Sequence, residues 1–197
     1  MSKKPNRVRI VGIDPGSRKA GWGIIDVDLI SRKFEHVDNG VIFLDTDAEL
    51  PDRLVELSEG LHRVLEKFRP ALAAVEDVFV QKSARSALIL GQARGACLAT
   101  LGLCHVKVHS HTPSQVKLRV TSRGRATKEQ VAHMVSLTLG LAEHPFEDAA
   151  DALAVALCHG IELTSVMAPV KLPSQRKQSA KGARASLEAL ARAQGKI

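Results

Sequence analysis

Four acidic side chains occupy positions that are unusual for ionised groups. Asp14 and Glu76 each come directly after a short apolar run. Asp148 and Asp151 lie three residues apart in an alanine-rich segment. Bringing several negative charges together where apolar segments end is costly unless a cation neutralises them. Carboxylates without an accompanying cysteine or histidine pair suit Mg²⁺ or Mn²⁺, hard ions that retain waters and bind substrate phosphates. The four acids therefore predict a divalent metal site.

Each acid also has an ordinary interpretation when it is considered alone. Asp14 begins the sequence Asp-Pro-Gly-Ser, in which every residue type is common in turns. Glu76 can lie exposed at the rim of a sheet, and the two later acids can be favoured by the dipole at the start of a helix. Their combination favours a shared site, because strand ends and helix starts of an α/β sheet gather at one edge. Such convergence is what a two-metal nuclease requires.

The elements that position these acids follow from the hydrophobic pattern, which predicts an α/β fold with a five-stranded mixed sheet flanked by helices. Short connections between the first three strands predict antiparallel pairing, and strand–helix–strand segments later in the chain predict parallel pairing. Strands are expected at residues 8–13, 21–27, 34–43, 72–80 and 105–109. Helices are expected at residues 52–68, 83–101, 127–140 and 146–159.

Residues 111–128 interrupt the periodic pattern and are expected to form an exposed basic loop. Five like charges in twelve residues repel one another without an anion, so the loop favours phosphate binding, although a solvated surface is the ordinary alternative. The basic residues are Lys117, Arg119, Arg123, Arg125 and Lys128.

One aromatic side chain lies close to the predicted metal site. Phe79 is one of only five phenylalanines and follows Glu76 by three residues. It is interpreted either as a core residue or as a ring that stacks on unpaired bases. No role is assigned to the histidines at 109, 111 and 144.

The helix expected at 83–101 contains several small side chains. They permit close approach of another element, which can be the chain's own sheet or the same helix of a second copy in a homodimer.

Composition limits the domain organisation and the partners. The chain has 197 residues, 45% of them hydrophobic, which suffice for one domain. This domain is expected at 8–165, between a basic extension at 1–7 and a basic, flexible tail at 166–197. The net charge of +7 arises from the ends, since residues 10–165 contain 17 basic and 20 acidic side chains. No apolar run is expected to span a membrane, and three cysteines without a CxxC pair predict a reducing, cytoplasmic location.

Five motifs occur in order along the chain: Gly-Ile-Asp-Pro-Gly-Ser at 12–17, Val-Glu-Asp-Val-Phe at 75–79, Leu-Gly-Gln-Ala-Arg-Gly at 90–95, Gln-Val-Lys at 115–117 and Asp-Ala-Ala-Asp-Ala-Leu-Ala at 148–154. Together they resemble the RuvC family of bacterial Holliday junction resolvases, collinearly from about residue 8 to 160. The resemblance implies a ribonuclease-H-like fold, a homodimer and Mg²⁺-dependent paired nicking of four-way DNA junctions. It also implies RuvA and RuvB, the branch-migration complex, as partners.

The resemblance gives individual residues expected roles. It implies that the four acids are the catalytic groups and hold two Mg²⁺ ions, for which Mn²⁺ can substitute, and that cleavage leaves 5′-phosphate and 3′-hydroxyl ends. Phe79 matches the family's base-stacking aromatic, and Lys117 and Lys128 match its DNA-contacting lysines. The two arginines of residues 121–126, Arg123 and Arg125, extend the basic surface.

Two other classes of protein share some of these features. An actin-like or sugar-kinase-like ATPase has a similar first phosphate loop, but it requires a second related domain that nothing after residue 100 resembles. A noncatalytic basic DNA-binding protein would account for the charge and not for the acids.

Overall fold

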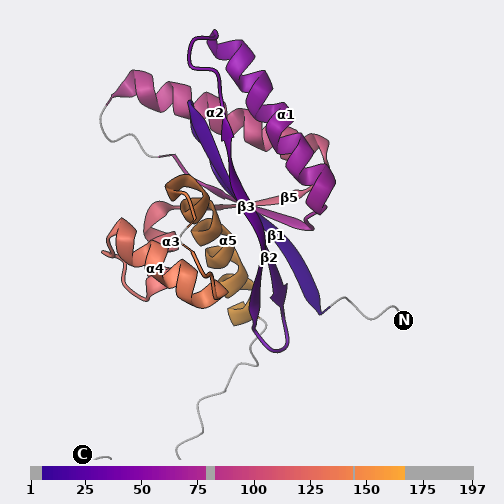
Figure 1. Cartoon of the computed structure of the whole chain (residues 1–197), viewed down its shortest axis with the longest axis vertical. Helices are drawn as coiled ribbons and strands as arrows, with labels where there is room; N and C mark the ends of the chain where they lie inside the picture. The colour runs from indigo at the N-terminus through magenta and orange to yellow at the C-terminus, as the bar shows by residue number, and fades with distance from the viewer. Residues whose placement is uncertain (1–5, 79–82, 144, 167–197) are drawn as a thin grey trace, which may run out of the picture. The chain divides into compact units, whose positions relative to one another are not determined.

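A five-stranded mixed sheet with helices on both faces forms the centre of the computed structural model of this protein (Figure 1). The structure describes residues 6–78, 83–143 and 145–166. The chain divides into two units, Met1–Met167 and Ala168–Ile197, and all described residues belong to the first. The elements are β1 (Arg7–Asp14), β2 (Lys19–Asp28), β3 (Phe34–Phe43), α1 (Leu50–Phe68), β4 (Leu72–Glu76), α2 (Ala84–Leu103), β5 (Lys107–His111), α3 (Pro113–Thr121), α4 (Lys128–Leu139) and α5 (Glu147–Val166).

The strand order is β3-β2-β1-β4-β5. β1, β2 and β3 pair antiparallel, as expected for strands joined by short turns, and β1, β4 and β5 pair parallel across the crossovers through α1 and α2. The predicted fold class is therefore confirmed. Because successive strand residues face opposite sides, Ile10 packs in a core with α3, α4 and α5, whereas Val11 packs in a second core with α1 and α2.

The helix α5 lies directly against the sheet because the strands beneath it contain glycine. A Cβ atom at Gly12 would lie 2.0 Å from the backbone oxygen of Ala152, and one at Gly21 would lie 1.9 Å from that of Asp148. Only glycine allows the two backbones to approach so closely. The alanine-rich helix is consequently almost entirely buried from Ala149 to Gly160.

The expected loop at 111–128 is wrong over half its length, because Pro113–Thr121 forms α3. Thr112 and Gln115 make a reciprocal capping box at its start, and Ser122 ends it with a left-handed φ of 59°. The basic side chains at 117 and 119 are therefore on a helix, and only residues 122–127 form a connection.

The bounds of other elements also differ from expectation. β4 ends at Glu76 rather than at residue 80, β5 spans Lys107–His111 rather than 105–109, and α5 continues to Val166 rather than ending at 159. Glu76 is therefore the last residue of its strand. The shift in β5 places His111 opposite Glu76 in the parallel register.

Two helices, α2 and α5, are long and apolar enough to cross a membrane by length and composition alone, contrary to expectation. The apolar window of α5 is 67% buried inside the fold, which is the ordinary state of a core helix. The window of α2 is only 22% buried, so much of its apolar surface faces outward in the single chain.

We predict that Gly21→Ala destabilises the protein by about 1–3 kcal/mol, because the added methyl group clashes with the backbone of α5 at Asp148. Urea unfolding can be followed by the fluorescence of the only tryptophan, Trp22, whose ring centroid lies 5.6 Å from that of Phe68. Gly124→Ala is the control, because no heavy atom lies within 4 Å of its Cβ position. Equal midpoints for both variants would contradict the close packing of α5.

Candidate active site

Two of the four acids lie at one edge of the sheet. Asp14 is the last residue of β1 and Glu76 is the last residue of β4. These strands are parallel neighbours, with Ile13 opposite Val75, so both carboxylates emerge at the same carboxyl end. Both side chains are partly buried.

The other two acids are brought to this edge by α5. Asp148 and Asp151 lie in its first turns, and the backbone of Asp148 rests on Gly21, which is paired with Asp14 across β1 and β2. The glycine contact therefore determines how closely the helix acids approach the strand acids.

The electrostatics show that the acids form one cluster. Burial, the largest cause, and the charges of Glu76, Asp151 and Asp148 together raise the pKa of Asp14 to about 8. Burial and Asp151 likewise raise the pKa of Glu76 to about 7. The pKa of Asp151 is also raised, chiefly by burial, against the opposing effect of a lysine. Without a cation, part of this cluster retains protons at neutral pH.

Two lysines act as counterions of the cluster. Lys128 Nζ lies 2.7 Å from Asp151 Oδ2 and 2.6 Å from Glu147 Oε1, and Lys19 forms an ion pair with Asp148. Burial lowers the pKa of Lys128, but its hydrogen bonds to Asp151 and Glu147 outweigh burial and raise it overall. Lys128 was identified from the sequence, but Lys19 was not. The one feature that could have indicated a role for Lys19 is its position at the start of β2, the strand paired with β1.

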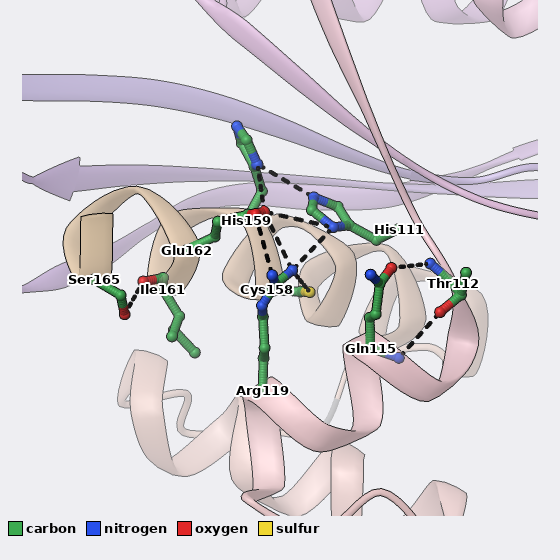
Figure 2. Close-up of polar contacts among 9 residues, drawn as sticks. All are labelled: His111, Thr112, Gln115, Arg119, Cys158, His159, Ile161, Glu162 and Ser165. Atoms are coloured by element: carbon green, nitrogen blue, oxygen red, sulfur yellow. Dashed lines mark hydrogen bonds and ion pairs between the residues drawn. The ribbon is translucent and has the colours of Figure 1, made fainter. Parts of the chain in front are cut away.

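The remaining predicted residues lie in different places. Lys117, on α3, is close enough to lower the pKa of Glu76. Arg123 and Arg125 are exposed on the connection between α3 and α4. Arg119 is directed elsewhere and pairs with Glu162 on α5 at 3.1 Å (Figure 2). Phe79 lies outside the described residues.

A second residue that sequence reasoning missed, Arg94 of α2, holds the end of β4. Its Nε donates to the backbone oxygen of Glu76 at 3.1 Å, and its Nη2 donates to Asp77 Oδ1 at 2.6 Å and to Ser110 Oγ at 2.7 Å. These contacts fix the backbone from which the Glu76 carboxylate projects. The motif at 90–95 contained this arginine, but its partners were not evident from spacing.

The donor set fits hard divalent cations. It consists of carboxylate groups, three of which have pKa values raised by burial and by repulsion from neighbouring acids, and a cation relieves both penalties. Lysine ammonium groups provide part of that compensation.

Comparison with known proteins agrees with this geometry. The sequence profile of the family described as crossover junction endodeoxyribonuclease RuvC matches residues 10–159. The chain belongs to the RuvC family. RuvC of Citrifermentans bemidjiense is 49% identical over 150 residues, which cover 76% of this chain and 90% of the relative. RuvC of Trichlorobacter lovleyi is 44% identical over 174 residues, which cover 87% and 97%.

Solved RuvC structures share the fold. The chain is similar to T. thermophilus RuvC in complex with a Holliday junction substrate, with a TM-score of 0.75 and 33% identity over 81% of this chain and 96% of that one. The yeast mitochondrial Holliday junction resolvase Ydc2 matches with a TM-score of 0.59 at 15% identity, covering 84% and 83%, and shows the fold alone. RuvC proteins are nucleases by name. Membership of this family implies a requirement for a divalent metal, and the carboxylate cluster is suited to bind one.

We predict opposite pH trends with and without Mg²⁺. In EDTA, stability should fall as pH rises from about 4 towards 8, because the folded-state pKa values of Asp14 (about 8) and Glu76 (about 7) lie above their ordinary values. Stabilisation by Mg²⁺ should grow over the same range, because the ion binds the deprotonated carboxylates. Thermal unfolding between pH 5 and 9 measures both trends.

Lys128→Met should move the onset of Mg²⁺ stabilisation upward by about one pH unit, because Lys128 lowers the pKa of Asp14, Glu76 and Asp151. Lys67→Met is the control, since Lys67 pairs with Asp38 at 3.2 Å. A profile for Lys128→Met that matches the wild type would contradict the assigned coupling.

Proposed function

We propose that this protein is a Mg²⁺-dependent endonuclease that resolves Holliday junctions by paired, symmetric nicks during DNA recombination and repair. The principal support is the carboxylate cluster formed by β1, β4 and α5, in a chain whose relatives are crossover junction endodeoxyribonucleases. A solved relative in complex with a junction substrate supports four-way DNA as the ligand.

In this proposal the four acids, Asp14, Glu76, Asp148 and Asp151, hold two Mg²⁺ ions, and Mn²⁺ can replace Mg²⁺ because it accepts the same oxygen ligands. When bound, the ions supply an activated water and neutralise charge on the departing 3′ oxygen. The backbone contacts of Arg94 hold the Glu76 carboxylate in place. The contact of α5 with Gly21 does the same for the helix acids.

The lysines of the cluster have a second role in the proposal. When metal ions neutralise the acids, the acids no longer require Lys19 and Lys128 as counterions. Both lysines can then contact DNA phosphates. Lys117, on the neighbouring helix, adds a further positive charge beside Glu76. Binding by these groups should weaken as salt concentration rises.

The DNA surface extends beyond the acids. Arg123 and Arg125 project from the exposed connection before α4, where they can hold backbone phosphates. Phe79 follows Glu76 by three residues, and we propose that its ring stacks on bases opened at the junction centre. The basic extension at 1–7 and the tail from 166 add nonspecific attraction for DNA.

We also propose a homodimer with α2 in its interface. A Cβ at Gly91, Gly95 or Gly102 would meet no heavy atom within 4 Å, and Leu88 and Leu103 are 70% and 81% exposed. Glycine in an exposed helix costs up to about 1 kcal/mol relative to alanine, and no contact among the described residues of one chain requires glycine at these positions. Close approach of a second α2 would use both the glycines and the exposed leucines.

A two-fold symmetric dimer places one site on each of two related strands of a junction. Cuts made in this way are symmetric. RuvA and RuvB are the proposed partners that move the branch point, as the family resemblance implies. The three cysteines are free, which fits the proposed cytoplasmic location.

We predict that Asp14→Asn binds junction DNA normally but loses cleavage, on the order of 100-fold or more, since even an outer partner of a metal ligand costs 10–100-fold. Binding is measured by gel mobility shift in EDTA, and cleavage by mapping cuts in four-way, linear and flap DNA with Mg²⁺. Asp47→Asn, at an exposed position, is the control.

Normal cutting by Asp14→Asn would remove Asp14 from the site. Junction binding without any cleavage by the wild type would favour the noncatalytic DNA-binding alternative. Thermal stabilisation by nucleotides would favour the ATPase alternative.

We predict that Gly95→Glu converts the dimer to a monomer without unfolding it. Glutamate favours a helix more than glycine does, so the single chain should remain stable, while a charged side chain prevents close approach of two helices. Sedimentation velocity measures the oligomeric state, with Gly124→Glu as the control. A dimer that persists in Gly95→Glu would exclude this face of α2 from the interface.

A further inference from the structure

A cluster of two buried histidines and a glutamate, none of which is one of the four acids, lies between β5 and α5 (Figure 2). His111 Nε2 lies 3.2 Å from His159 Nδ1, and Glu162 Oε2 lies 3.7 Å from His159 Nδ1. The two imidazoles are 3% and 2% exposed. Within residues 6–78, 83–143 and 145–166, this is the only group of three or more such side chains whose ligand atoms all lie within 4.8 Å of one another.

The spacing matches that of a transition-metal site. Zinc bonds of roughly 2.0–2.2 Å in a tetrahedron place neighbouring donor atoms about 3.3–3.5 Å apart. The separations of 3.2 and 3.7 Å from His159 Nδ1 to the other two ligand atoms lie on either side of that range, and all three ligand atoms lie within 4.8 Å of one another. Two imidazoles and one carboxylate, with an open fourth position, form an ordinary zinc ligand set.

The histidines are already in the protonation state that a metal requires. Burial, together with the charges of His109 and His111, lowers the pKa of His159 to about 4, and burial lowers the pKa of His111 as well. Both rings are therefore neutral at pH 7. The ring of His109 stacks on that of His159 at 4.1 Å between centroids, which holds the imidazole in its orientation.

Arg119 occupies the remaining side of the cluster. Its Nη1 lies 3.3 Å from His111 Nδ1 and 3.2 Å from Glu162 Oε2. Because a guanidinium only donates, His111 must accept at Nδ1 and donate from Nε2 to His159 Nδ1. His159 Nε2 then carries a proton, and this buried atom has no hydrogen-bond partner among the described residues. Hydrogen bonds alone leave the cluster incomplete.

We propose that His111, His159 and Glu162 form a zinc-binding site separate from the catalytic acids. The ion takes the place of the hydrogen bond between the two rings, the proton of His111 shifts from Nε2 to Nδ1, and the partly exposed Arg119 side chain moves away from His111 Nδ1 and from the carboxylate. The site joins β5 to α5. His111 pairs with Glu76 in the sheet and α5 supplies Asp148 and Asp151, so the bound ion braces the two elements beside the active site.

The test uses the full-length protein, stripped of metal and returned to excess Mg²⁺, which occupies the four acids. Zn²⁺ is titrated against a chromophoric chelator, and Co²⁺ absorption reports the coordination geometry. We expect one Zn²⁺ per chain, a higher melting temperature, and a Co²⁺ spectrum typical of four ligands. Asp14→Asn should bind Zn²⁺ as the wild type does.

Glu162→Gln and His111→Gln should each weaken Zn²⁺ binding by at least about 10-fold. Glu162 is 37% exposed, so its variant should fold. His62→Gln is the matched control, because His62 forms a histidine–glutamate pair with Glu66 at 3.3 Å outside the cluster. Absence of Zn²⁺ binding, or equal affinity in all three variants, would overturn the site and leave a hydrogen-bond network. DNA cleavage is not the readout, so this result is independent of the proposed nuclease activity.

Discussion

Mutual repulsion among four carboxylates, opposed by the close packing of α5 on the sheet, is the constraint on which the site depends. The helix reaches the sheet because glycines at 12 and 21 remove the Cβ atoms that would separate the backbones. That contact fixes the helix acids near the strand acids, and burial together with the neighbouring negative charges raises the pKa values of Asp14 and Glu76. The packing of a large apolar core therefore stabilises an arrangement that its own charges oppose, and cations relieve the opposition.

One of the lysine counterions likewise combines an unfavourable interaction with favourable ones. Lys128 is the first residue of α4, where the helix dipole disfavours a positive charge. Its ion pairs with Glu147 and Asp151 offset that penalty. Lys128 is therefore unfavourable for the start of α4 but favourable for the acids of α5. This conflict is consistent with a lysine that serves the site rather than the helix.

Much of this arrangement could be predicted because the relevant signals are local. Apolar runs that end at Asp14 and Glu76 predicted that both acids lie at one edge of the sheet. The strand that contains Glu76 was expected to continue to residue 80, but it ends at Glu76 as the parallel neighbour of β1. α3 was not predicted, although Thr112 and Gln115 form the same capping pattern that Thr127 and Gln130 form at the start of α4. The basic residues that follow were interpreted as loop chemistry. The histidine cluster and the contacts of Arg94 could not be predicted, because they join residues from separate elements whose side-chain directions depend on packing.

Arg94 connects the two surfaces on which paired cleavage would depend. It projects from α2, whose exposed glycines and leucines form the proposed dimer surface, and it holds the backbone of Glu76 and the side chain of Asp77 at the end of β4. A displacement of α2 would therefore be transmitted through one planar guanidinium to a carboxylate of the site, because its fork fixes both distance and direction. Lysine has a single charged atom and could not hold the backbone oxygen, the aspartate and Ser110 simultaneously in this geometry. The helix that would bind the second copy thus also positions an acid of the site, so dimer formation and the arrangement of the carboxylates share a structural element.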